Sequence, residues 1–199
     1  MATRKRAESA AASRPVEELL REALAALERK STDKDRGNLK RFGIDAPKSF
    51  GVSMSNIQAI AKSLGRRNHA LAAALWDTGW YEARLMACYV DDPLQVTPAQ
   101  MNRWRRDFDN WAVCDTACFV LFDRTPHAWA KASEWRGAKN EFQKRAAFAM
   151  IACLGVHDKV ASDQQFLDAL VWIEEAALAD ERHFVQKGIS WALRVAGRR

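Results

Sequence analysis

The amino-acid sequence predicts an all-α fold in which about ten short helices stack in antiparallel pairs as an α-solenoid. Apolar residues recur at spacings of three and four along most of the chain, and no segment shows the sustained alternation of a strand. The 199 residues include only 9 Gly and 5 Pro, fewer turn residues than a β-sandwich or barrel requires. A hydrophobic content of 48% with 28% charged residues excludes global disorder.

The first half of the chain predicts four helices. Residues 15–30 start with Pro and two acids and keep apolar residues at helical spacing. The stretch 31–52 is basic, rich in turn residues and the least regular part, so it is expected to be a connection. A helix capped by Ser53 or Ser55 ends at Gly65. Shorter helices follow at 68–77 and 80–91, closed by Gly79 and by Asp92-Pro93 respectively.

The second half predicts six more helices. Thr97-Pro98 and Thr125-Pro126 each combine a capping residue with a proline suited to the first turn. The run CFVLF at 118–122 has the composition of a buried strand, but it continues the helical spacing of Trp111 and Asp115. Gly155 is expected to end the helix that begins at 139. The expected helices are 97–109, 111–123, 126–137, 139–154, 163–179 and 181–196.

These helices predict one domain, because pairs of them recur every 30–45 residues or so, as in HEAT-like repeats. We expect residues 15–199 to form this single helical-repeat domain and residues 1–14 to form a disordered basic tail. The tail has no apolar segment of a secretory signal, and no window approaches a membrane span. The four cysteines lie in apolar runs and indicate buried free thiols. A cytoplasmic monomer that does not bind membranes is therefore expected.

The net charge of +6 is concentrated in two segments. Residues 1–14 carry a net +3, residues 29–41 carry +4, and the rest of the chain sums to −1. A local basic surface on a nearly neutral body suits a polyanion such as nucleic acid. A solvated basic tail and loop would have the same composition. In a repeat array, cations at helix ends would line one concave basic face.

Familiar catalytic motifs are absent. The sequence has no phosphate-binding glycine loop, no HExxH and no GxSxG, and its four histidines do not pair at metal-ligand spacing. We therefore expect no metal and no cofactor.

The residues that could carry chemistry are acidic, aromatic and basic. Trp111 and Asp115 share one helix face, which continues through Phe119 and Phe122. An aspartate on an apolar face is costly unless it is paired or used, so Asp115 is either a functional carboxylate or the partner of an arginine or a helix end. Arg145 borders the apolar stripe of its helix, either for function or with its head in solvent.

Basic residues on two helices fit a phosphate backbone. In the last helix, Phe184, Gly188, Trp191, Ala192 and Val195 form the expected core stripe. Lys187, Trp191, Arg194 and Arg198 form a second line at helical spacing. Trp191 could equally be an ordinary core residue beside cations that favour a helix C-terminus. Arg103, Arg105 and Arg106 flank Trp104, and Lys40 and Arg41 belong to the basic stretch.

Three segments together resemble the bacterial DNA alkylation repair family of HEAT-like alkylpurine DNA glycosylases. They are NWAVCDTA at 110–117, QKRAAFAMIACL at 143–154 and DERHFVQKGISWALR at 180–194. FGIDAPKSFGVSM at 42–54 is similar to an early glycine-containing segment of that family. The resemblance covers residues 30–196, and the residues before 38 match poorly.

The resemblance implies a role for each matched residue. The family's catalytic aspartate falls on Asp115, its preceding aromatic on Trp111, its site arginine on Arg145 and its C-terminal aromatic on Trp191. Lys187, Arg194, Lys40, Arg41, Arg103 and Arg106 are the expected DNA contacts. The implied activity is release of cationic alkylpurines, of the 3-methyladenine or 7-methylguanine type, from duplex DNA in base excision repair. The alternatives are a non-catalytic module that binds DNA or RNA structures and a protein-interaction scaffold.

Overall fold

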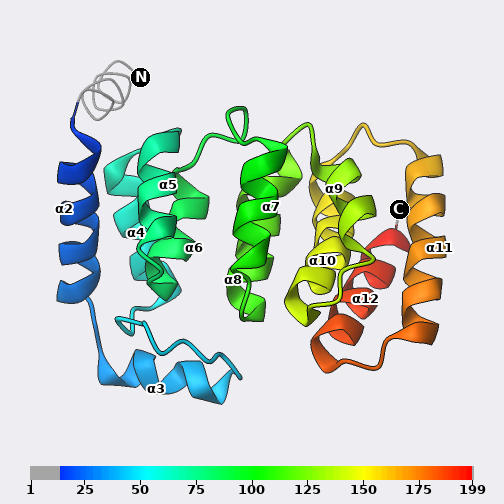
Figure 1. Cartoon of the computed structure of the whole chain (residues 1–199), viewed down its shortest axis with the longest axis horizontal. Helices are drawn as coiled ribbons and strands as arrows, with labels where there is room; N and C mark the ends of the chain where they lie inside the picture. Colours follow the sequence, from blue (N-terminus) through cyan, green and yellow to red (C-terminus); the bar gives the residue numbers. More distant parts are fainter. Residues whose placement is uncertain (1–13, 199) are drawn as a thin grey trace. The chain divides into compact units, whose positions relative to one another are not determined.

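The computed structural model describes residues 14–198, and every regular element in that range is a helix (Figure 1). The expected all-α fold is confirmed. The chain divides into two compact units that meet in sequence between Gln95 and Val96. The expected tail falls outside the described residues except for Arg14, whose Nη2 pairs with Glu18 at 2.5 Å. None of the helices in the described range is long and apolar enough to cross a membrane.

The first unit contains the helices α2 to α6. Their bounds are α2 Val16–Arg29, α3 Asp33–Arg41, α4 Met54–Leu64, α5 His69–Asp77 and α6 Tyr81–Val90. Helix α6 packs against α2, α4 and α5, so it lies at the centre of this unit. The predicted helices 15–30, 53–64, 68–77 and 80–91 correspond to α2, α4, α5 and α6. Ser53 is the N-cap residue of α4, and Gly65 ends the helix with φ +92°.

Helix α3 was not predicted, because the segment 31–52 was expected to be an irregular connection. No residue of α3 is buried, so the helix has no apolar face that a sequence pattern could reveal. The ends of α3 do carry residues typical of helix termini. The Thr32 hydroxyl accepts a hydrogen bond from the Asp35 backbone N–H at 3.0 Å, and Lys40 and Arg41 occupy the last turn. Figure 1 shows α3 set apart from the other helices of its unit.

The second unit is built around one enclosed helix. It contains α7 Pro98–Arg106, α8 Trp111–Thr116, the π-helical turn η1 Ala117–Leu121, the 3₁₀ turn η2 Phe122–Arg124, α9 Ala128–Trp135, α10 Glu141–His157, α11 Asp163–Ala179 and α12 His183–Ala196. Helix α10 packs against α8, η1, α9 and α12. Every residue of α10 from 145 to 154 is buried. The expected apolar stripe of this helix is therefore wider than predicted.

Two details of this unit correct the sequence interpretation. Gly155 does not end its helix, because α10 continues to His157. A Cβ at Gly155 would lie 2.5 Å from Val195 Cγ1, so the glycine permits close approach of α12. The expected helix 111–123 widens into a π turn at Ala117. Its face therefore splits, with Phe122 fully buried and Phe119 exposed.

Candidate functional site

Helix α8 positions the first two candidate residues. Asn110 is its N-cap residue, and the side-chain oxygen of Asn110 accepts a hydrogen bond from the Val113 backbone N–H at 3.0 Å. This cap starts the helix at Trp111, so Asp115 follows one turn later on the same face. The π turn begins only at Ala117 and leaves this pair in α-helical register. Trp111 is half-buried.

Asp115 is bound by Arg145 from helix α10. The guanidinium donates from Nε to Asp115 Oδ1 at 2.8 Å and from Nη2 to Oδ2 at 2.7 Å. This two-point geometry is the strong form of an arginine–carboxylate pair. The side chain of Arg145 is 7% exposed and that of Asp115 is 21% exposed. The guanidinium head is therefore not in solvent, which was the alternative interpretation, and the side chain of Asp115 remains partly accessible.

Arg145 also ties helix α12 to the pair. Its Nη1 donates to the Phe184 carbonyl at 2.7 Å, and the Phe184 backbone N–H donates to Glu141 Oε1 at 2.8 Å. Gly188 lies beside this pair, and a Cβ there would meet Arg145 Cγ at 3.4 Å, which is an ordinary van der Waals contact. Glu141 and Arg145 lie one turn apart on α10 and hold the same residue of α12. Sequence analysis did not single out Glu141, whose position at the start of an N-capped helix is its only local signal.

The electrostatics of the pair follow from its burial. Loss of hydration raises the pKa of the Asp115 carboxyl above its usual range, and the guanidinium of Arg145 opposes this rise. Burial acts to lower the pKa of Arg145, but the hydrogen bond and the charge of Asp115 outweigh it and leave that pKa raised. Arg145 therefore stays charged, and Asp115 is a carboxylate that burial makes more basic than a surface aspartate.

The candidate residues of α12 lie on a partly exposed side of the helix. Trp191 is half-buried, whereas Lys187 and Arg194 are exposed. Arg194 Nη1 donates to Ser190 Oγ at 2.5 Å. The expected core stripe is rotated from its predicted position, and the buried residues are Val185, Gly188, Ile189 and Ala192.

The remaining candidate cations lie on α7 and α3. Arg106, Lys40 and Arg41 are exposed, and Arg103 is half-buried. Arg105, which flanks Trp104 in the same cluster, stacks over the Trp135 ring at 5.3 Å and serves packing. The structure therefore leaves Lys40, Arg41 and Arg106 accessible to a polyanion.

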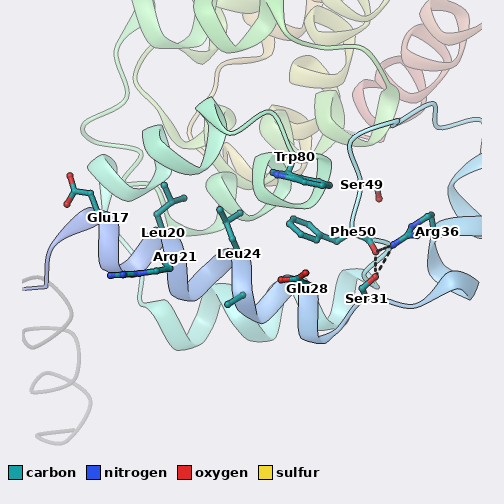
Figure 2. Close-up of a pocket in the computed structure, with 11 residues that line it drawn as sticks. Glu17, Leu20, Arg21, Leu24, Glu28, Ser31, Arg36, Ser49, Phe50 and Trp80 are labelled. Atoms are coloured by element: carbon teal, nitrogen blue, oxygen red, sulfur yellow. Dashed lines mark hydrogen bonds between the residues drawn. The ribbon is translucent and has the colours of Figure 1, made fainter.

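The first unit contains a pocket of about 820 Å³ that the sequence did not predict. Figure 2 shows Leu20 and Leu24 of α2 on one side and the aromatic rings of Phe50 and Trp80 on the other. These rings stack with centroids 4.0 Å apart. Arg36 and Ser31 bond the Phe50 carbonyl and close one end.

A buried carboxylate supports this aromatic wall. Glu82 is fully buried and accepts hydrogen bonds from the Ser49 hydroxyl and from the backbone N–H groups of residues 50–52, at 2.7 to 3.2 Å. The only signal for Glu82 in the sequence is an acid within the apolar run 80–90. Glu82 therefore holds the loop that carries Phe50.

Other titratable side chains are paired for structure. Asp91 Oδ1 accepts a hydrogen bond from His69 Nδ1 at 2.7 Å, and Asp123 pairs with His157. The four cysteines are free and buried, as predicted. Among residues 14–198, no cluster of His, Cys, Asp and Glu side chains could hold a metal ion.

Comparison with known proteins defines the class. The sequence model of the family described as DNA alkylation repair enzyme matches residues 23–199, so this chain belongs to that family. The match begins earlier than the resemblance at residue 30 and includes the second half of α2.

A solved structure has the same fold. It is described as "a new family of proteins related to the HEAT-like repeat DNA glycosylases with affinity for branched DNA structures". The two chains superimpose with a TM-score of 0.77 at 20% identity, over 88% of this chain and 74% of that one. The HEAT-like repeat fold expected from the sequence is thereby confirmed. No curated protein matches the sequence.

Proposed function

We propose that this protein is a monofunctional DNA glycosylase that hydrolyses the N-glycosidic bond of cationic alkylated purines in duplex DNA. The observation that carries the proposal is the Asp115 carboxylate, which Arg145 orients while the aspartate side chain stays partly accessible. Membership of the DNA alkylation repair enzyme family supports the same reaction class.

The proposed reaction needs one carboxylate and no general acid. A 3- or 7-alkylated purine already carries a positive charge, so the electron pair of the C1′–N bond leaves with the base and neutralises it. The deoxyribose becomes an oxocarbenium ion, which the Asp115 carboxylate stabilises. Water then adds to C1′ and loses its proton to solvent. A carboxylate has about four lone-pair sites, so the two bonds from Arg145 leave room for this water.

The other residues take supporting roles in this proposal. Arg145 is a positioning residue, because its guanidinium is bonded to Asp115 and the Phe184 carbonyl. The indoles of Trp111 and Trp191 would attract the cationic base or sugar, with about 0.5–2 kcal/mol for each cation–π contact. Lys187, Arg194, Arg103, Arg106, Lys40 and Arg41 would neutralise phosphates along the duplex.

Base release tests the proposal directly. The purified protein and its Asp115→Asn variant would be incubated with duplex DNA carrying N7-methylguanine or N3-methyladenine, and free bases would be measured. We expect release by the wild-type protein and by Asp33→Asn, a control at an exposed aspartate, but none by Asp115→Asn. Asp115→Asn should still fold and bind DNA. Full activity of this variant would exclude the assigned role.

A second candidate is a non-catalytic module for branched DNA. Both oxygens of Asp115 are occupied by Arg145, as in an ion pair that serves only structure, and affinity for branched DNA is described for the structural neighbour. This candidate predicts no base release by any variant and tighter binding to a four-way junction than to a linear duplex. Base release and junction binding, measured with the same purified proteins, therefore distinguish the two functions.

A further inference from the structure

The outer face of helix α11 carries an exposed apolar stripe. Leu167, Val171 and Leu178 are 55, 53 and 83% exposed. Their spacing of four and seven residues places them within a narrow arc of the helix. The opposite face of α11 is the buried one, formed by Phe166, Ala169, Ile173 and Ala176. Helix α11 therefore has two apolar faces, of which the fold covers one.

The same helix is strongly acidic. Between Asp163 and Ala179 the sequence has Asp163, Asp168, Glu174 and Glu175 but no Lys, Arg or His, although the whole chain carries +6. Glu174 borders the arc of the apolar stripe. Arg136 of α9 flanks the helix, pairing with Glu175 at 2.9 Å and lying over the Trp172 ring. The stripe is thus an apolar surface in a field of negative charge.

The position of α11 exposes this stripe to partners. Helix α11 packs on α12, and Figure 1 shows it at an outer side of the second unit. Terminal helices of repeat arrays usually have a polar outer face, because no further repeat covers them. Three large apolar side chains exposed along one line of such a helix instead indicate an interaction site.

The negative charge of α11 indicates which kind of partner its outer face can bind. A DNA backbone would be repelled by four carboxylates, and the same face of a second copy would bring like charges together. We propose that the outer face of α11 docks a cationic amphipathic helix of another protein. Its apolar residues would cover Leu167, Val171 and Leu178, while its Lys and Arg side chains would pair with Asp168 and Glu174. This proposal does not depend on catalysis at Asp115.

Binding of designed peptides tests the docking face. A labelled helical peptide of the length of α11, with leucines at spacings of four and seven and flanking lysines, would be titrated with the full chain by fluorescence anisotropy. We expect binding that weakens at least about tenfold in the Val171→Asn/Leu178→Asn variant. Leu94→Asn, which changes an exposed leucine of the first unit, should bind as the wild type does.

A charge exchange makes the test specific. Glu174→Lys should weaken binding of the lysine peptide and strengthen binding of the same peptide with glutamates in place of lysines. Equal binding of both peptides to the wild type, or no loss in the double variant, would overturn the proposal. Dimerisation by analytical ultracentrifugation that the double variant abolishes would assign the face to a second copy instead. A loss of duplex affinity in that variant would assign it to DNA.

Discussion

Asp115 and Arg145 show how a buried ion pair can serve two purposes. Removing charges from water destabilises the folded state. Two hydrogen bonds between the partners and a third to a backbone carbonyl offset this loss of hydration. The arrangement holds α8, α10 and α12 together at one point. The charge of Arg145 also favours the ionised carboxylate, and its two hydrogen bonds orient it, as the proposed reaction requires.

Loss of the arginine should destabilise the protein strongly. Arg145→Ala leaves a largely buried carboxylate without its partner, so we expect the free energy of unfolding to fall by about 3 kcal/mol. Urea denaturation would measure this change. Arg194→Ala, at an exposed arginine, should change stability by less than about 0.5 kcal/mol. Similar losses in the two variants would mean that the Asp115–Arg145 pair contributes little.

The pH dependence of base release should report the Asp115 pKa. The ionised carboxylate is the proposed active form, and burial raises its pKa, so activity should be lost on the acid side at higher pH than for an ordinary aspartate. Arg145→Gln removes the charge that opposes this rise, so the acid limb should move to still higher pH. Single-turnover rates at saturating enzyme would show the shift. An acid limb that stays in place would exclude Asp115 as its source.

At the scale of elements, one glycine permits a close contact between helices. A Cβ at Gly155 of α10 would lie 2.5 Å from Val195 Cγ1 of α12, whereas a Cβ at Gly188 would make only an ordinary contact with Arg145. The π turn after α8 has a complementary effect, because it redirects the residues beyond Ala117 while Trp111 and Asp115 keep their register. The candidate site therefore depends on where helices touch and where they widen.

Gly155→Ala should test the contact between α10 and α12. The new Cβ would lie 2.5 Å from Val195 Cγ1, and valine side chains are stiff, so we expect a loss of about 1–3 kcal/mol in unfolding free energy. Adding Val195→Ala should restore part of the loss. Gly137→Ala, where a Cβ meets nothing within 4 Å, is the matched control and should be close to neutral. Thermal melts of the wild type, Gly155→Ala, Gly155→Ala/Val195→Ala and Gly137→Ala would measure these changes in stability.

At the scale of the whole molecule, charge determines which partners each surface can bind. The basic residues proposed for DNA lie on α3, α7 and α12, whereas α11 bears carboxylates alone. A protein with +6 overall can therefore bind a polyanion through these basic residues and a cationic protein segment through α11.

The salt dependence of duplex binding should identify the phosphate contacts. Each contact to B-DNA contributes about 0.9 to the slope of log K against log salt concentration. Lys187→Gln and Arg194→Gln should each lower that slope by about this amount, measured by anisotropy across a salt series. Lys62→Gln, at an exposed lysine of α4 without a proposed role, should leave it unchanged. Unchanged slopes in the first two variants would remove α12 from the DNA-binding surface.

The sequence by itself determined the all-helical fold, most helix boundaries and the family, because apolar spacing, capping residues and short motifs are local properties. Helix α3 was not predicted, since a helix without a buried face has no apolar spacing, although its capping residues are present. Only the tertiary structure showed that Arg145 binds Asp115, 30 positions away, that Glu141 caps Phe184, and that Gly155 permits a helix contact. These features depend on which helices meet, and packing between distant segments decides that.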